Sequence, residues 1–263
     1  MKSSSPSFPK SLLPSLVLGC GIATASAGIP ALGPASTPET SGLDSEFHVG
    51  YNSDYIFRGD RRGGDLYEFG FDFAGSGQVP LLGDLDWSAG VWYASYEVDS
   101  PNLNSSNNEL DVYAEVRKPL NDVVSIAVGI INYSYFGNGA PGGTNDDVEP
   151  YVAIGIDFFA LDLGFAFYYD GSDNYRHDFY SEFTAGYEHE ISERLTANLE
   201  AVIGVFDESN ANPAKGSDVY YGGTASLSVA VTDQITVTPY VAATSSSNLG
   251  DYFFGGVSVG FGF

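Results

Sequence analysis

Hydrophobic residues alternate with small or polar residues along the end of the chain, from Asp251 to Phe263. Because the side chains of a strand point alternately to its two faces, this segment predicts a β-strand with one apolar face. After Asp251 it contains neither a charged residue nor a proline, the features that protect exposed edge strands of soluble sheets. The pattern favours a strand paired on both sides in a closed membrane barrel, with a core strand of a soluble β-sandwich as the alternative.

The same period-two alternation recurs along most of the chain, with many Tyr, Phe and Gly residues. No window of about 18 apolar residues occurs, so the sequence predicts no membrane-spanning helix. The alternation predicts strands at residues 46–58, 65–74, 85–97, 108–117, 123–136, 148–158, 161–170, 178–190, 194–206, 218–231, 234–245 and 251–263.

The gaps between these strands alternate in length. The long, polar gaps have the sequences RGDRRGGD, VDSPNLNSSNN, GNGAPGGTNDD, DGSDNYRH, DESNANPAKGSD and TSSSNLG. Tight connections lie between them, at Leu120-Asn121-Asp122, Ala160, Ser192-Glu193 and Thr232-Asp233, with one longer exception around GSGQVPLLGD. Long outer loops alternating with short periplasmic turns are typical of outer-membrane barrels with an even number of strands. The sequence therefore predicts an all-β fold, a transmembrane antiparallel up-and-down β-barrel of 12 strands with both termini in the periplasm.

Alternation also assigns the two faces of each strand. At residues 65–74, Phe69 and Phe71 face one way and Glu68 and Asp72 face the other. A charged side chain on the lipid face near the bilayer midplane costs about 2 to 4 kcal/mol, so the apolar face must contact lipid and the charged face must line the lumen. Near Asn132 the alternation breaks, and we expect a β-bulge there.

The charged residues of the lumen are the main candidate site. The predicted lumen charge network consists of Asp54, Arg58, Glu68, Asp72, Glu109, Asp111, Glu115, Arg117, Asp157, Asp162, Glu182 and Glu200. Asp86, Glu149 and Glu188 are assigned to the same face. A water-filled lumen of this kind attracts cations and repels anions. In a plugged lumen the acids would instead pair with Arg58, Arg117 and polar side chains. The sequence does not decide between a water-filled and a plugged lumen.

The overall charge agrees with a lumen of this kind. The chain contains 34 acidic and 10 basic residues. Nucleic-acid-binding proteins present basic surfaces, so this balance excludes nucleic acid as a partner.

The first 27 residues predict a secretory signal peptide. Lys2 and Lys10 precede an apolar run, and Ala25-Ser26-Ala27 is a small-residue cleavage pattern. Cys20 marks a competing site, because the residues before it resemble a lipoprotein box, although with an unusual leucine. Residues 28–43 are rich in Pro, Gly, Ser and Thr and predict a flexible periplasmic leader, and residues 44–263 are predicted to form the barrel.

The sequence contains no motif for a catalytic centre. G-x-S-x-G, H-E-x-x-H and a phosphate loop are all absent. The histidines are His48, His177 and His189, and none of them has a ligand pattern around it. We therefore predict no enzyme activity, no cofactor and no metal site. A divalent cation that bridges a loop to lipopolysaccharide stays an open alternative, held by Asp146, Asp147 and Glu149 or by Asp170 and Asp173.

Phe261 and Phe263 end the last predicted strand. A terminal Phe after an alternating strand resembles the signal by which outer-membrane barrels are recognised for insertion. The predicted partners are accordingly the barrel-assembly machinery, outer-membrane lipid and lipopolysaccharide, together with small solutes. The sequence does not determine the oligomeric state.

The run Tyr51-Asn52-Ser53-Asp54-Tyr55-Ile56-Phe57-Arg58-Gly59 resembles the opening motif of a bacterial conserved-hypothetical family labelled Gcw-chp. The resemblance covers about ten residues and implies a barrel in the outer membrane with an unassigned, transport-related role. This chain continues with Asp60-Arg61-Arg62, where the family usually has a Ser/Gln-rich segment. Asp54 and Arg58 lie four apart on the lumen face, so we expect them to join a charge network across the seam with the last strand or to anchor barrel closure.

Together these patterns predict a protein of the cell outer membrane. The function they favour is passive, porin-like diffusion of small hydrophilic solutes with a preference for cations. The alternative is a non-conducting structural or surface-interaction barrel that acts through its extracellular loops. An outer-membrane hydrolase is a third hypothesis, with no catalytic set to support it.

Overall fold

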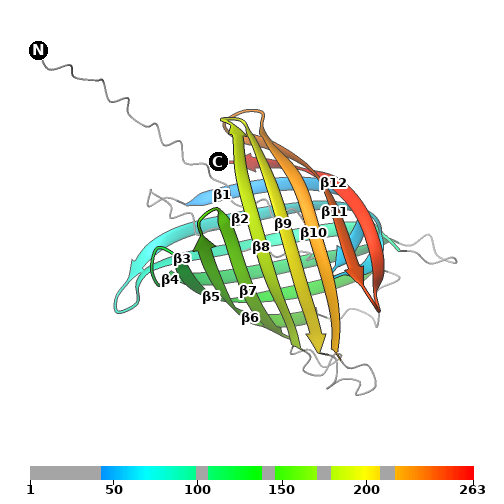
Figure 1. The fold of residues 1–263 in the computed structure, drawn as a ribbon, viewed down its shortest axis with the longest axis horizontal. Helices are drawn as coiled ribbons and strands as arrows, with labels where there is room; N and C mark the ends of the chain where they lie inside the picture. The colour runs from blue at the N-terminus through cyan, green and yellow to red at the C-terminus, as the bar shows by residue number, and fades with distance from the viewer. Residues whose placement is uncertain (1–42, 99–105, 138–145, 171–178, 208–216) are drawn as a thin grey trace, which may run out of the picture.

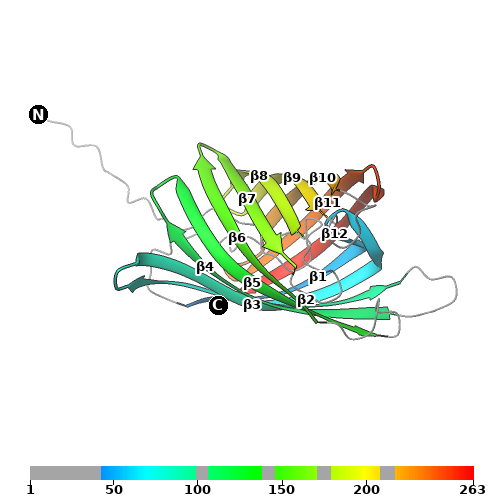
Figure 2. The same cartoon turned by 90° about the horizontal axis from the view of Figure 1, so that it is seen from below.

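The computed structural model describes residues 43–98, 106–137, 146–170, 179–207 and 217–263, which form a closed antiparallel barrel (Figures 1 and 2). Each strand pairs with its neighbours in sequence, and β1 pairs with β12 to close the barrel. The predicted 12-stranded up-and-down barrel is confirmed. Its strands are β1 (Asp44–Phe57), β2 (Asp60–Val79), β3 (Gly83–Glu97), β4 (Ser106–Pro119), β5 (Val124–Gly137), β6 (Asp146–Phe158), β7 (Leu161–Tyr169), β8 (Phe179–Ser192), β9 (Leu195–Asp207), β10 (Ser217–Ala230), β11 (Ile235–Ser246) and β12 (Gly250–Gly262). The described residues include no helix long and apolar enough to span a membrane.

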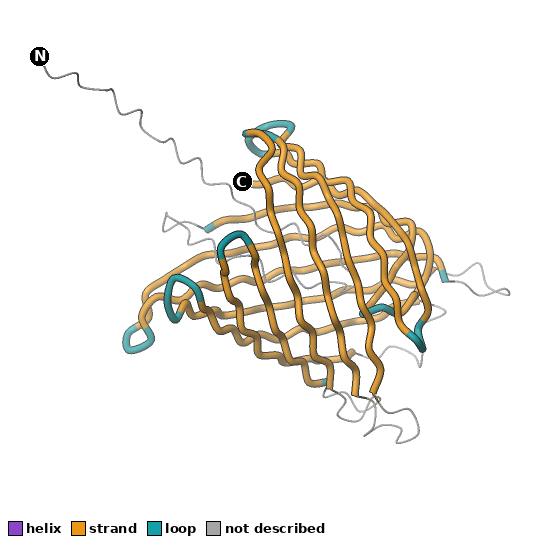
Figure 3. The backbone as a smooth tube through the Cα atoms, in the orientation of Figure 1, coloured by secondary structure: helices purple, strands orange, loops and turns teal. Residues whose placement is uncertain are grey.

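The barrel has two different ends. The C-terminus and the five tight turns from β2–β3 to β10–β11 lie at one end, here called the terminal end (Figure 3). Side chains hold two of these turns: Asn121 Oδ1 accepts hydrogen bonds from the backbone N–H groups of Val123 and Val124, and Thr232 Oγ1 accepts one from Ile235. The other end, here called the loop end, carries the β1–β2 turn and the longer connections. Tight turns therefore form where Asn, Asp or Thr can bond the backbone locally.

The β1–β2 connection is not the long loop that RGDRRGGD predicts. Residues 60–64 belong to β2, and the connection is a two-residue turn at Arg58 and Gly59. The φ angles of these two residues are 50° and 80°. Positive φ at both central positions is the pattern of a type I′ turn, whose twist matches that of the flanking strands. Gly59 adopts it without cost, whereas Arg58 needs compensating contacts.

Two further connections are shorter than predicted. The segment GSGQVPLLGD is mostly strand, because β2 continues to Val79 and β3 starts at Gly83. The last gap is also tight, since β11 ends at Ser246 and β12 starts at Gly250. Long connections remain after β3, β5, β7 and β9, and their central residues 99–105, 138–145, 171–178 and 208–216 lie outside the described residues. The same holds for residues 1–42, and hence for the predicted signal peptide, Cys20 and almost all of the predicted leader.

The β5 strand pairs with both neighbours without a register shift, so the bulge expected near Asn132 was wrong. Ile131 and Tyr133 are buried inside the barrel, and Asn132 lies on the outer face, where it donates a hydrogen bond to Ser134. The outer face is otherwise an apolar belt. Its exposed side chains include Phe69, Val91, Val112, Val128, Val152, Phe183, Leu199 and Val241.

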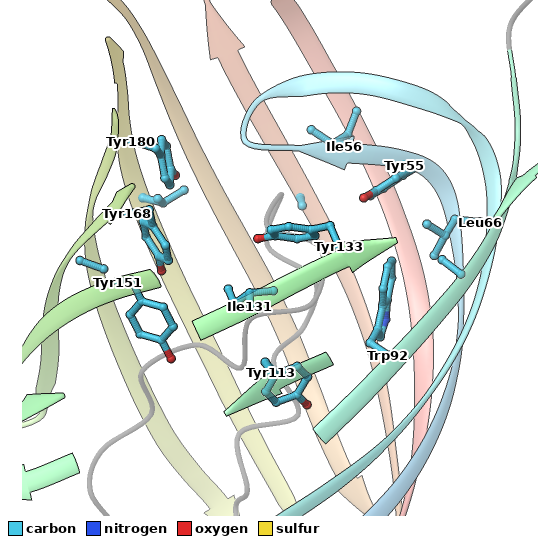
Figure 4. Close-up of a cluster of buried hydrophobic side chains, with 14 of the residues drawn as sticks. Tyr55, Ile56, Leu66, Trp92, Tyr113, Ile131, Tyr133, Tyr151, Tyr168 and Tyr180 are labelled. Carbon is cyan, nitrogen blue, oxygen red and sulfur yellow. The ribbon is translucent and has the colours of Figure 1, made fainter. Parts of the chain in front are cut away.

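The β1–β2 hairpin bends into the barrel at the loop end. The ladder between β1 and β12 ends at the pair Asn52 and Gly256, whereas β1 stays paired with β2 up to the turn. A register shift between Tyr55 and Ile56 accompanies this departure. Ile56 is buried, which places the hairpin inside the wall (Figure 4). The hairpin tip therefore belongs to the contents of the lumen.

Candidate functional site

The tip of the β1–β2 hairpin spans the lumen. Arg58 Nη1 and Nη2 donate hydrogen bonds of 2.9 and 2.5 Å to the two carboxylate oxygens of Glu149. Glu149 belongs to β6, which lies halfway around the barrel from β1. Gly59 packs against Tyr220 of β10, and Phe57 meets Tyr133 of β5 edge-on at 5.9 Å. The hairpin thus contacts several parts of the facing wall.

Aromatic rings and a second carboxylate enclose the Arg58 guanidinium. Its Cζ lies 4.0 Å from the ring centre of Tyr180 and 5.0 Å from that of Tyr168. These two tyrosines donate hydrogen bonds to Glu182, of 2.7 and 3.3 Å respectively. Tyr133 donates one to Glu149. We call Tyr133, Glu149, Tyr168, Tyr180 and Glu182 the Arg58 cage (Figure 4 shows its tyrosines).

A pair of carboxylates on β4 lies beside the cage. Glu109 and Asp111 are both 0% exposed. Glu109 accepts a hydrogen bond of 2.8 Å from Tyr55, whereas neither carboxylate oxygen of Asp111 has a donor among the described residues. Arg62, farther out on the hairpin, acts electrostatically on Glu109. Buried carboxylates therefore outnumber buried guanidinium groups at the loop end, which makes this region attractive to cations.

Toward the terminal end, the lumen contains two smaller polar clusters. His48 Nδ1 lies 3.1 Å from Asp72 Oδ2, and Tyr113 also donates to Asp72. Next to them, Trp92 Nε1 donates a hydrogen bond of 2.8 Å to Glu68. In the second cluster, Glu115 accepts bonds from Arg117 at 2.9 Å and Tyr151 at 2.8 Å.

Charge is unevenly distributed around the wall. Asp157 and Asp162 lie directly opposite each other on β6 and β7, and the same row continues through Glu200 to Thr224 of β10. Beyond β9 the wall is rich in hydroxyl groups, and its acidic residue is Asp218 near the loop end, which accepts a hydrogen bond from Ser246. Its inward side chains include Thr224, Ser226, Ser228, Thr238, Thr244 and Ser258. A strongly acidic wall of β1 to β9 therefore faces a weakly charged, hydroxyl-rich wall of β10 to β12.

The structure places the predicted lumen charge network as follows. By register, its members share the inward face with the buried tyrosines, with Asp54 near the hairpin root. Asp54 and Arg58 are not joined, and neither forms the expected network across the seam with β12. Asp54 pairs with Arg61 at 2.6 Å, and Arg58 pairs with Glu149 across the lumen. The network across the seam was wrong because the hairpin leaves β12 before Asp54, and the alternative that these residues anchor barrel closure stays a prediction.

Sequence analysis missed two partners in this site. Arg61 was assigned to an outer loop, although it continues β2. Alternation assigns Glu149 to the lumen but gives no means of pairing it with a residue 91 positions away. The one available signal was Arg58-Gly59 itself, since a Gly in the second position of a two-residue turn is typical of hairpins.

At the terminal end, the C-terminal residues close the seam. Phe263 N donates a hydrogen bond of 3.0 Å to Ser45 O, and Ser45 Oγ donates one of 2.9 Å to Phe263 O. The Phe263 ring packs against Phe71 at 5.8 Å, and Phe261 packs against Phe47 at 6.1 Å. The residues of the predicted insertion signal are thus also structural parts of the barrel.

The described residues contain no group of three or more His, Cys, Asp or Glu side chains with the geometry of a metal site. Glu149, a candidate ligand for a cation bridging to lipopolysaccharide, turns into the lumen and binds Arg58 instead. His177 and Asp173 lie outside the described residues.

Solved outer-membrane proteins share this fold. An outer-membrane channel from Pseudomonas putida F1 superposes with a TM-score of 0.55 at 8% sequence identity, over 85% of this chain and 96% of that chain. The NanC porin superposes with a TM-score of 0.50 at 15% identity, over 84% of this chain and 99% of that chain. At such low identities the likeness concerns the fold alone. No protein-family model matches the chain, and no curated protein matches it in sequence.

Proposed function

We propose that this chain is an outer-membrane channel for the passive diffusion of small hydrophilic solutes, with a preference for cations. The fold supports the location, since its solved neighbours are outer-membrane barrels and the outer face is an apolar belt. The observation that carries the proposal is the acidic wall of the lumen. Its carboxylates far outnumber Arg58, Arg117 and His48, so the potential inside favours cations and opposes anions.

In this proposal the tip of the β1–β2 hairpin, which carries Arg58, is the constriction of the channel. It crosses the loop end of the lumen and is held there by side chains rather than by the β1–β12 ladder. At the hairpin root, the space among Asn52, Tyr55, Glu68 and Trp92 amounts to a cavity of about 10 Å³, room for about one water molecule. Because the hairpin tip crosses the lumen, we infer that conduction at the loop end depends on its displacement, which separates a closed state from an open one.

The test is the conductance of the refolded protein in a planar bilayer with a KCl gradient. Discrete current steps with a reversal potential that favours cations would support the proposal. Steps that favour anions would overturn the argument from the acidic wall. A barrel that is folded, as shown by its heat-modifiable migration on a gel, but carries no current in any voltage range would overturn the channel function.

The second candidate is a non-conducting barrel that binds partners through its loops. Its support is the hairpin tip, which crosses the loop end of the lumen, and the length of the connections after β3, β5, β7 and β9, the longest between the strands. Deletion of residues 137–147 discriminates between the two. An interaction barrel would lose binding to cells or surfaces without a change in permeability, whereas a channel would keep its cation preference.

A further inference from the structure

The Arg58 cage has the composition of a receptor for a guanidinium group. Glu149 binds the two terminal nitrogens of Arg58 side by side, the paired geometry that a guanidinium makes with a carboxylate. Tyr168 and Tyr180 present their rings to the cation, and Glu182 adds a second carboxylate behind them. The cage thus contacts the terminal nitrogens and the central carbon of the Arg58 guanidinium. Arg58 Nε has no hydrogen-bond partner among the described residues.

Arg58, which occupies the cage, lies on a hairpin tip that is not paired with β12. Beyond Asn52, β1 no longer pairs with β12, and the hairpin tip carries its own turn. Arg58 adopts a φ of 50°, a left-handed conformation that is unfavourable for a residue other than Gly. The cage contacts offset this local cost. Displacing the hairpin would leave Glu149 and Glu182 buried without a cation, which is unfavourable unless another cation takes the place of Arg58.

We propose that the Arg58 cage is a binding site for solutes that bear a guanidinium group, and that Arg58 is its built-in competitor. A solute with this group replaces Arg58 on Glu149, between the Tyr168 and Tyr180 rings, and the hairpin moves away from the facing wall. The proposal rests on the proposed channel function in one respect: the solute reaches the cage by traversing the lumen. The binding step itself requires no current.

The charge around the cage fits a cationic ligand. Glu109 and Asp111 lie two residues apart on the inward face of β4, and Glu149 lies on the inward face of β6, two strands away. Arg62 and its partner Asp60 lie on the hairpin and move away with Arg58. When the hairpin leaves, Arg58 is withdrawn from the cage, and the carboxylates remain on β4, β6 and β8. The vacant cage is therefore more negative than the occupied one.

The experiment uses the Arg58→Asn variant of the full chain in detergent. Asn tolerates positive φ and forms type I′ turns with a following Gly, so the hairpin turn is retained while the guanidinium is removed. Methylguanidinium chloride is the probe, and methylammonium chloride is the comparison ion. Calorimetry gives the affinity, and the midpoint of thermal unfolding gives the stabilisation by the bound ion.

We expect Arg58→Asn to bind methylguanidinium at least about tenfold more tightly than the unaltered protein does, because Arg58 no longer competes. The matched control is Arg58→Asn combined with Glu149→Gln, which should lose this binding. Equal binding by the single and double variants would overturn the site, and so would equal binding of methylammonium, which cannot form the paired hydrogen bonds. If Arg58→Asn refolds poorly, methylguanidinium must raise its refolding yield above that in methylammonium, and equal yields would overturn the proposal. A cage that binds in a barrel without current would refute the channel function while leaving the binding site intact.

Discussion

Arg58 on the β1–β2 hairpin binds Glu149 on β6 through two hydrogen bonds that cross the lumen. Both side chains are almost completely buried, with exposed fractions of 4% and 5%. A buried ion pair of this kind is a weak source of net stability but a strong determinant of position, because separating the charges leaves each one desolvated. The pair therefore fixes where the hairpin lies more than how stable the barrel is.

The first prediction concerns conductance. Arg58→Asn removes the bond across the lumen and keeps the turn, so we expect larger or more frequent open steps than in the unaltered protein. Single-channel recording at equal protein density measures this. Arg61→Ala is the matched control, since Arg61 lies on the same hairpin but pairs with Asp54 near its root. An equal increase in both variants would show that a general loosening of the hairpin, and not the Arg58 pair, controls the opening.

The second prediction concerns stability. Glu149→Gln leaves the buried Arg58 without its carboxylate, and we expect a loss of about 3–5 kcal/mol in the free energy of unfolding. Arg58→Asn combined with Glu149→Gln removes both partners of this ion pair and should recover part of the loss. Urea titration of the three variants in detergent gives the coupling energy. Strictly additive effects would contradict the pairing of these two residues.

Alternation along the chain predicted the wall of the barrel and failed at the hairpin for one physical reason. A strand in the wall contacts lipid on one face, so charges are excluded there and period-two patterns such as Phe69 and Phe71 stand out. The hairpin tip contacts no lipid, and that constraint disappears. Arg61 and Arg62 therefore lie in a strand although their charges indicated a loop.

The candidate site was predictable only in part. Inward residues follow from alternation alone, and Glu109, Asp111 and Glu182 lie where it placed them. Their partners depend on the stagger of distant strands and on the direction of the hairpin. The bond between Arg58 and Glu149 needs both, together with a positive φ at a residue that seldom adopts it. No pattern within β1 contains that information.

The third prediction concerns ion selectivity. Asp157 and Asp162 face each other across the β6–β7 ladder, whereas Glu115 is already paired with Arg117 at 2.9 Å. Asp157→Asn with Asp162→Asn should therefore lower the cation preference more than Glu115→Gln does. Reversal potentials in a KCl gradient measure the difference. A larger effect of Glu115→Gln would indicate that ions pass along the β4 part of the wall.

The fourth prediction tests the packing of the lumen rings. A methyl group added at Gly204 would overlap the ring of Tyr220, which contacts both Tyr180 and the hairpin residue Gly59. Gly204→Ala should cost about 1–3 kcal/mol of stability through displacement of this ring. Gly77→Ala is the control, because an added Cβ at Gly77 has nothing within 4 Å. Chemical denaturation of both variants measures the difference, and equal midpoints would show that the Tyr220 ring can move at little cost.

The fifth prediction separates the two roles of the C-terminal residue. Phe263 bonds Ser45 across the seam and packs against Phe71, so its loss weakens closure wherever the barrel folds. If Phe263 is also the insertion signal, Phe263→Ala should lower the yield in cells far more than the yield of refolding from urea into detergent. Phe253→Ala is the control, since Phe253 is an outward phenylalanine of the same strand with 75% of its surface exposed. Equal losses in cells and in detergent would assign Phe263 to barrel closure alone, because purified refolding contains no assembly machinery to recognise it.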